Sequence, residues 1–268
     1  MKKFLIIVSV FCLIFTNCAS NPLTGKSTMA FVNNSELFPS SFQQYDQFLD
    51  ENTIITGTAD AAMVNRVGTK LKQAAEKWLN SEGQGHYLDD YAWEYNLIQS
   101  NEVNAWCMPG GKIVVYTGIL PVTKDEEGLA VVLGHEVSHA LLNHGQQRMS
   151  AGLVQQLGAV GVSLGAGLLG LSEQTQAMAM TAYGVGSELG GTLPFGRSHE
   201  NEADHYGLIL MAIAGYNPES AVPFWERMAA MGGGGTPEWL STHPSDATRI
   251  NNLKGWVPEA KEKAAQLK

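Results

Sequence analysis

The chain has 268 residues, of which 44% are hydrophobic and 16% are charged, and its formal net charge is −9 at pH 7. This apolar content is enough for one sizeable globular domain and excludes a chain that is disordered throughout. The acidic balance, with no basic run beyond the first three residues, argues against a protein that binds the phosphate backbone of nucleic acids.

The N-terminus has the pattern of a bacterial secretory signal. Two lysines precede the apolar run from Phe4 to Phe15, which is too short to span a bilayer in a mature protein. Cys18 follows this run at the place of the lipid-attachment cysteine of bacterial lipoproteins, and Ala19 after it is typical of outer-membrane sorting. We therefore predict a signal peptide over residues 1–17 and a lipid on Cys18. The alternative is ordinary cleavage that leaves this cysteine unmodified.

Turn-forming residues such as Asn21-Pro22 are frequent over residues 18–58, which we predict to be a tether between the lipid and one domain over residues 59–268. Within this domain, apolar residues recur at helical spacing from Asp60 to Leu79. A small sheet is expected next, with strands around Trp93–Gln99, Val103–Met108 and Lys112–Thr117, the last two joined at Pro109-Gly110-Gly111.

A helix is expected from about Thr123 to His144. Its first residues, Thr123-Lys124-Asp125-Glu126, have the pattern of a capping box, apolar residues recur behind them at helical spacing, and Gly145 is placed to end the helix as a left-handed cap. Gly134 is costly inside a helix, so it predicts that another backbone or a functional site approaches closely there.

The most informative motif of the chain, His135-Glu136-Val137-Ser138-His139, lies on this helix. Residues four apart on a helix share one face, so His135 and His139 can ligate one zinc ion while Glu136 reaches a water molecule at the metal. A chance match is the alternative, and the helical context argues against it. The motif therefore predicts a zinc peptidase that binds one zinc ion per chain.

A catalytic zinc keeps three protein ligands, so a third donor is needed. Candidates lie over residues 198–207, the polar start of a helix expected to end at Gly215. Glu200 and Asp204 share a helix face, which lets the first bind metal and the second accept the outer N–H of a ligand histidine, whereas Glu202 points away. From the spacing alone, the comparable candidates are His199, Glu200, Glu202, Asp204 and His205, and a solvated charged helix start is the alternative.

Several blocks of the chain match one family: Asn104-Ala105-Trp106, Pro109 to Gly118, the zinc helix, Leu193-Pro194-Phe195, Glu200 to Asp204, and Thr242-His243-Pro244 with Arg249-Ile250. In these blocks the chain resembles the membrane-associated zinc metalloendopeptidases, the family that includes HtpX, BepA and the CAAX prenyl endopeptidases. The resemblance implies that Glu200 is the third zinc ligand. It departs at Gly196, where a serine is common, and at His205, where an arginine is common.

Residues 149–172 carry no charge, a length at which a membrane span must be considered. The densest apolar part, Leu157 to Leu171, is shorter and favours buried or interfacial helices. We predict a helical hairpin over residues 149–190 that covers the site. Contact with a bilayer and plain core helices both remain open.

Four glycines, Gly232 to Gly235, precede His243 and are expected to form a mobile hinge. His243 could act as a displaceable fourth zinc ligand that keeps the free enzyme inactive, or it could donate a hydrogen bond to the oxyanion of the transition state. A solvated loop histidine is the third possibility.

Together these features predict a mostly helical α+β, gluzincin-like peptidase domain with a small β-sheet beside the zinc helix. The zinc ligands are His135, His139 and Glu200, the base is Glu136, and Asp204 orients a ligand. The expected function is cleavage of unfolded or misassembled envelope proteins, as quality control on the periplasmic face of the outer membrane, with substrate added as a strand beside the sheet. The alternative, a non-catalytic assembly factor or chaperone for outer-membrane proteins with a structural zinc site, would not need a base.

Overall fold

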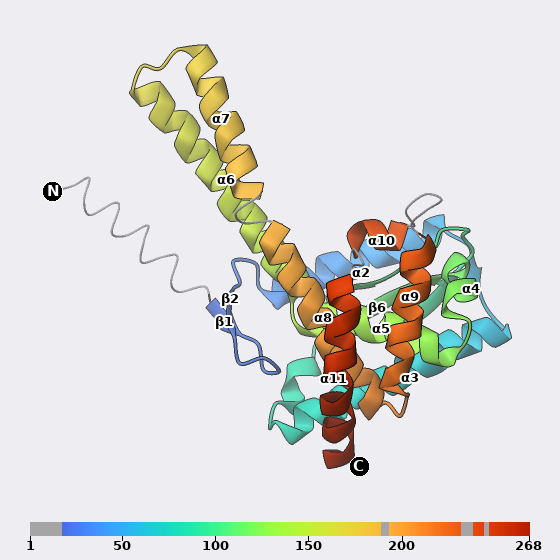
Figure 1. Ribbon diagram of the computed structural model, residues 1–268. Helices are drawn as coiled ribbons and strands as arrows, with labels where there is room; N and C mark the ends of the chain where they lie inside the picture. The colour runs from blue at the N-terminus through green and yellow to red at the C-terminus, as the bar shows by residue number, and fades with distance from the viewer. Residues whose placement is uncertain (1–17, 189–192, 232–237, 244–246) are drawn as a thin grey trace.

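The computed structural model describes residues 18–188, 193–231, 238–243 and 247–268. The described elements are β1 (Cys18–Ser20), β2 (Ser27–Met29), α2 (Asn34–Glu51), β3 (Ile54–Ile55), α3 (Ala59–Ser81), η1 (Gly85–Leu88), β4 (Glu94–Ile98), β5 (Ala105–Met108), β6 (Lys112–Tyr116), η2 (Thr117–Ile119), α4 (Leu120–Thr123), α5 (Glu126–Leu141), α6 (His144–Leu168), α7 (Glu173–Ser187), α8 (Leu193–Ile213), η4 (Pro218–Ser220), α9 (Ala221–Met231), α10 (Glu238–Thr242) and α11 (Ala247–Gln266). The predicted mostly helical α+β fold is confirmed (Figure 1).

The main sheet has four strands in the order β3-β4-β6-β5, with β4 and β6 parallel and the other neighbours antiparallel. The three longer strands lie where alternation predicted them. Gly110 and Gly111 join β5 to β6 with φ values of +87° and +89°, a left-handed backbone that favours glycine. In this order β5 is an edge strand, and it lies against the zinc helix α5.

The hydrophobic core lies between the sheet and the helices α3, α5 and α8. Helix α3 begins after Thr58, whose side chain accepts a hydrogen bond from the backbone N–H of Ala61. Its fully buried side chains are Val64, Val67, Leu71 and Leu79, whose spacings of three, four and eight residues place them on one face of the helix. Burial of each such side chain stabilises the fold by about 1.5–3 kcal/mol, so this face holds the helix against the sheet.

Residues 18–58 differ from the turn-rich tether predicted for them. They contain the 18-residue helix α2, which packs on the sheet through Tyr45 and Phe48. The Tyr45 hydroxyl donates to the backbone carbonyl of Ile113 in β6 at 3.0 Å. The polar residues between these aromatic positions obscured the helical period, which becomes evident once the sheet offers an apolar surface.

The boundaries of the zinc helix also differ from the prediction. Helix α5 begins at Glu126, because Asp125 rather than Thr123 is the N-cap and accepts from the backbone N–H of Gly128 at 2.8 Å. The helix ends at Leu141, since Asn143 takes the left-handed conformation with φ of +56°. Gly145, predicted as the cap, lies inside the next helix, α6.

Helices α5 and α8 cross with their backbones in close contact. A methyl group added at Gly134 would lie 2.9 Å from the backbone oxygen of Gly207, and one added at Gly207 would lie 2.8 Å from the backbone of Gly134. The close approach expected at Gly134 is therefore found. This crossing brings the two site-bearing helices together.

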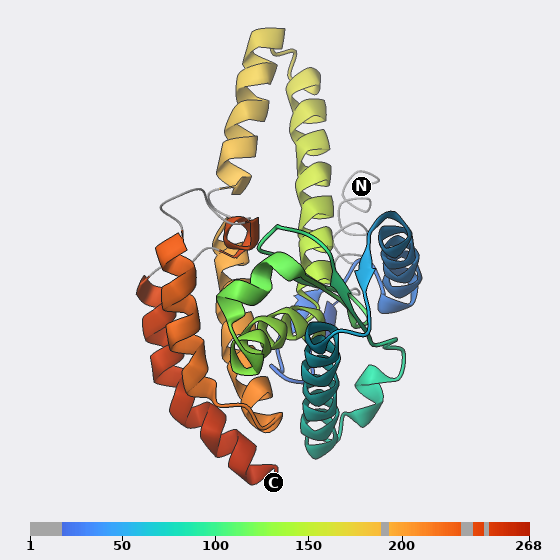
Figure 2. The same ribbon diagram turned by 90° about the vertical axis from the view of Figure 1, so that its right-hand side faces the viewer.

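Helices α6 and α7 pack against each other as a hairpin that projects from the body of the protein (Figures 1 and 2). None of the residues of α7, Glu173–Ser187, is buried, so α7 is not a core helix. Among the residues that the structure describes, α6 is the one helix long and apolar enough to cross a membrane, and only 6% of its most apolar stretch is buried.

Candidate metal centre

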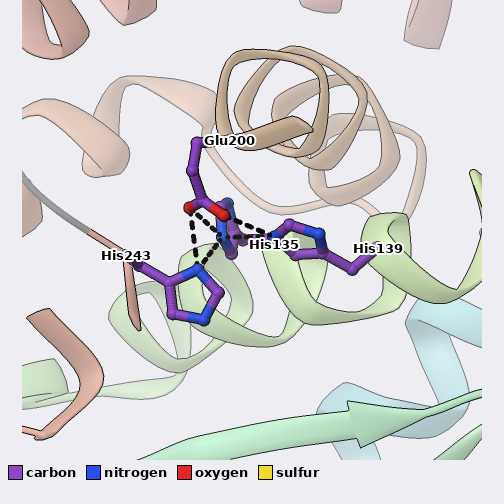
Figure 3. A group of neighbouring side chains, drawn as sticks. All are labelled: His135, His139, Glu200 and His243. Carbon is purple, nitrogen blue, oxygen red and sulfur yellow. Dashed lines mark hydrogen bonds and ion pairs between the residues drawn. The ribbon is translucent and has the colours of Figure 1, made fainter. Parts of the chain in front are cut away.

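Four side chains from three parts of the chain point toward one another in the interior (Figure 3). Helix α5 presents His135 and His139 one turn apart, α8 presents Glu200, and His243 follows directly after α10. One potential ligand atom from each residue lies within 4.8 Å of all the others. The two histidines of α5 are buried, with 2% and 5% of their surface exposed, so bulk water does not separate these groups.

The spacing of these atoms matches a tetrahedral zinc site. The Nε2 atoms of His135 and His139 lie 3.0 Å apart, and the carboxylate oxygens of Glu200 lie 3.3 and 3.4 Å from them. Ligand atoms about 2.0–2.1 Å from a tetrahedral zinc are themselves about 3.3 Å apart. His243 Nδ1 lies 3.0 Å from His135 Nε2 and 2.7 Å from a Glu200 oxygen, at the fourth corner.

A buried chain of hydrogen bonds through Asp204 and Arg249 sets the orientation of His135. Its Nδ1–H donates to Asp204 at 2.8 Å, which turns the lone pair of Nε2 toward the cluster. Arg249 in turn donates to Asp204 at 2.7 Å and to the backbone carbonyl of His243 at 3.2 Å. The guanidinium also stacks on Trp225, 3.5 Å from the ring centre. One arginine therefore ties the orienting carboxylate to the His243 segment.

The second ligand histidine is oriented by a different chain. His139 Nδ1 lies 2.9 Å from Nδ1 of His144, and His144 Nε2 lies 3.2 Å from Glu202. Lys26 pairs with the same Glu202 carboxylate. Glu202 points away from the ligand face of α8, as predicted, yet it still reaches the site through His144. The spacing of α8 does not reveal this role, because His144 comes from another helix.

Electrostatics favour a positive charge between these rings. Burial acts to lower the pKa of His135, but the carboxylates of Asp204 and Glu200 outweigh it and raise the pKa to about 9. Burial opposes ionisation of Glu200, yet its contacts with three histidines hold its pKa far below the usual range. Burial lowers the pKa of His139 and leaves that ring neutral, as a metal ligand must be. The donor set therefore fits a zinc ion.

Glu136 lies beside the cluster without belonging to it. The indole N–H of Trp239 in α10 donates to one Glu136 oxygen at 2.8 Å, and His243 Nε2 lies 3.4 Å from the same oxygen. The carboxylate is 4% exposed and is held in place by these contacts. A carboxylate next to the metal position, with one oxygen occupied, can use the other as a base.

The other candidates from α8 lie outside the cluster. His205 contacts α11, where it lies 2.9 Å from Glu259 and stacks on Trp256. His199 is buried and stacks on His144 with ring centres 4.0 Å apart. The four-glycine segment proposed as a hinge, Gly232 to Gly235, lies outside the described residues.

Sequence reasoning missed three residues of the site: His144, Trp239 and Arg249. Arg249 stood in a family-like block without an assigned role, and the other two carried no signal of their own. All three act through contacts between residues far apart in the chain. The backbone N–H of Trp239 also donates to the carbonyl of Val103, just before the edge strand β5, at 3.2 Å.

Comparisons with known proteins agree with this geometry. A family model described as peptidase family M48 matches residues 65–257. The mitochondrial metalloendopeptidase OMA1 of Schizosaccharomyces pombe is 38% identical over 178 residues, which are 66% of this chain and 50% of that protein. The metalloprotease YcaL of Escherichia coli is 23% identical over 206 residues, 76% of this chain and 78% of that protein. The beta-barrel assembly-enhancing protease of Yersinia pestis is 28% identical over 184 residues, 66% of this chain and 35% of that protein. The chain spans about half the length of the OMA1 proteins of two yeasts.

Proposed function

The chain belongs to peptidase family M48, and on that premise we propose that it is a zinc metalloendopeptidase, a hydrolase that cuts peptide bonds inside protein chains. The observation that carries this proposal is the convergence of two imidazoles, from His135 and His139, and the Glu200 carboxylate beside a separate base, Glu136. A structural zinc site is closed by its ligands and does not need that base. Glu136 therefore favours catalysis over a non-catalytic assembly role.

His135, His139 and Glu200 would hold the metal. When bound, zinc would supply the positive charge that acidifies a water molecule and polarises the scissile carbonyl. Asp204 keeps a proton on Nδ1 of His135, and Arg249 keeps Asp204 ionised and fixed. The protein thus sets the tautomer of a ligand before any substrate arrives.

Glu136 is the proton carrier in this proposal. Trp239 occupies one carboxylate oxygen, so the other accepts a proton from the attacking water and passes it to the leaving nitrogen of the cleaved bond. Because the carboxylate is buried and held by the indole, it is already oriented before the reaction, and no conformational entropy is lost in placing it.

The test compares purified protein with Glu136→Gln and with a surface control, Glu226→Gln, whose side chain is 55% exposed. We expect about one zinc per chain in all three and cleavage of casein by the wild type and the control only. Glu136→Gln should lose cleavage by a factor of 10² or more, on the order of the contribution of a general base. Full proteolysis by this variant would refute the assignment of the base.

The position of His243 supports a gating role. Its Nδ1 lies among the ligand atoms, where an imidazole can act as a displaceable fourth ligand and keep the free enzyme quiet. Its alternative role, donating to the oxyanion, predicts the opposite result. His243→Ala should raise basal cleavage if the residue gates, and lower it on the order of 10²-fold if it stabilises the oxyanion. Initial rates at matched zinc content distinguish the two.

For the substrate we propose unfolded or misassembled proteins of the cell envelope. The edge strand β5 lies against α5, so an extended segment added to it would run past the zinc ligands. Main-chain pairing of this kind recognises extended shape more than side-chain identity. One relative is named for assembly of β-barrels, which agrees with a role in outer-membrane quality control, whereas the OMA1 relatives are named as mitochondrial.

We also propose that a lipid on Cys18 attaches the chain to the periplasmic face of the outer membrane. Cys18 lies in β1, which pairs with β2, and β2 adjoins the base of α6. Cys18→Ala should abolish incorporation of radiolabelled palmitate during growth, with Cys107→Ala as the matched control. Persistent incorporation into Cys18→Ala would refute this site of attachment.

A further inference from the structure

The α6–α7 hairpin exposes an apolar surface that is unusual for a protein in water. Its exposed leucines include Leu157 and Leu164, each 63% exposed, and at the tip Leu168 and Leu169, 89% and 77% exposed. Over residues 149–187 the only charged residue is Glu173. Soluble proteins rarely expose contiguous apolar areas of this kind without a partner or a membrane to cover them.

Several polar side chains of the hairpin form hydrogen bonds within it. Gln155 donates to the Ser187 hydroxyl at 2.9 Å, and Tyr183 donates to the backbone carbonyl of Gln155 at 3.0 Å. Near the tip, Gln176 donates to the carbonyl of Leu171 at 2.8 Å. Internal pairing of polar groups is what a non-aqueous surrounding requires, because lipid offers no hydrogen-bond partner.

The two helices also pack as membrane helices do. Tyr183 fills the space over Gly158, where a methyl group would lie 2.0 Å from its hydroxyl, so the small residue permits close packing. Residues 151–168 of α6 extend about 27 Å at 1.5 Å per residue, close to the hydrocarbon thickness of about 30 Å. Glu173 follows directly after the tip, where the far headgroup region could solvate it.

We propose that the α6–α7 hairpin inserts tip first into a lipid bilayer. A partner helix from another protein would cover only one face of the hairpin. Here α7 as well as α6 is nearly free of charge, so the apolar surface is not confined to one face. The next charged residues outside this stretch are Arg148 and Glu188, both exposed, one on each helix at the base of the hairpin. The occupant that suits this whole surface is lipid.

Insertion would also determine where the metal centre acts. The hairpin connects α5, which carries His135 and His139, to α8, which carries Glu200, and His144 at its base contacts His139. The site would therefore be held near the membrane surface, and its substrates would be segments close to the bilayer. This last step rests on the proposed peptidase activity, whereas insertion itself does not.

The experiment measures depth in the full chain carrying Cys12→Ala and Cys18→Ala. A single environment-sensitive fluorophore is attached at Leu169→Cys or, as the control, at Lys254→Cys on the body, whose side chain is 54% exposed. Burial raises the pKa of the remaining thiol, Cys107, which disfavours its reactive thiolate form. The protein is mixed with phosphatidylcholine vesicles that carry bromine deep in the acyl chains.

We expect the tip label to be quenched at least threefold more strongly than the body label. Leu164→Glu combined with Leu168→Glu should abolish this quenching and lower vesicle binding by at least about 10²-fold, because charges in a bilayer core are costly. Met231→Glu, an exposed apolar position outside the hairpin, should change neither. Zinc content, compared across these variants, reports whether each has folded.

Equal quenching of tip and body labels would overturn the proposal. A chain that stays off the vesicles and forms an oligomer in solution that the paired glutamates dissolve would also overturn it, since the surface would then bind a second copy. Loss of casein cleavage with normal quenching would instead contradict only the proposed function.

Discussion

Substitution of Gly207 by alanine tests whether the crossing of α5 and α8 positions the metal ligands. The added methyl would lie 2.8 Å from the backbone carbon of Gly134 and 2.8 Å from the backbone nitrogen of His135. Ordinary contacts of a Cβ atom begin at 3.4 Å, so the helices must separate by several tenths of an ångström. Both neighbours are backbone atoms, which cannot rotate away as a side chain would.

The expected cost follows from two opposing effects. Overpacking of a rigid contact costs about 1–3 kcal/mol, while replacement of a helical glycine by alanine returns about 1 kcal/mol through helix propensity. We expect a net destabilisation of up to about 2 kcal/mol, which lowers the urea midpoint by up to about 1 M for a slope near 2 kcal/mol/M. Separation of Glu200 from the two histidines should also weaken zinc binding on the order of 10-fold.

The assay combines urea unfolding of the chelator-treated protein with a competitive zinc titration. Gly255→Ala is the matched control, because this glycine lies in α11 with nothing within 4 Å of an added methyl. It should stabilise the protein by about 0.5–1 kcal/mol and leave zinc affinity unchanged. A Gly207→Ala variant with an unchanged midpoint and unchanged zinc affinity would refute the argument that this contact sets the site.

Three further predictions use other parts of the structure. His144→Ala should lower zinc affinity by about 10–100-fold, since it removes the contact that orients His139, and Glu202→Gln should have a smaller effect; equal affinity to the wild type in a competition titration would contradict both. Hydrogen bonds from Arg66 and Tyr216, together with the charge of Arg66, lower the pKa of Glu126 from 4.5 to about 2. Because the folded-state pKa is the lower one, this stabilisation is complete above about pH 5 and is lost as the pH falls toward 2. The stability difference between wild type and Glu126→Gln, about 1 kcal/mol after allowance for solvent screening, should therefore shrink over that range in urea unfolding, and a constant difference would exclude the mechanism. Removal of zinc by a chelator should lower the thermal midpoint by roughly 5–10 °C, with recovery on adding zinc but not magnesium, because the donor set includes two imidazoles.

Local chemistry was predictable from the sequence alone. The four-residue spacing of His135 and His139 places both on one helix face whatever the rest of the fold does. Alternation and the Pro109-Gly110-Gly111 turn likewise indicated two paired strands, because their conformational demands are local. Gly134 indicated a close approach, although the sequence could not say that the approaching backbone was Gly207.

The relation between distant segments was decided only by the tertiary structure. Spacing along α8 made Glu200 and Glu202 comparable, and the choice between them depends on which face of α8 meets α5. The contacts of His144 with Glu202 and of Trp239 with Glu136 join residues 58 and 103 positions apart, so no local pattern could reveal them.

The α6–α7 hairpin shows the same division between sequence and structure. The sequence predicted that the hairpin is helical and nearly free of charge, because helical propensity and charge are local properties of its residues. These two properties do not distinguish a core helix from a helix that projects from the body, since both kinds can be apolar. Exposure depends on whether other segments of the chain cover the helix, and here the tertiary packing leaves Leu157, Leu164 and Leu168 uncovered.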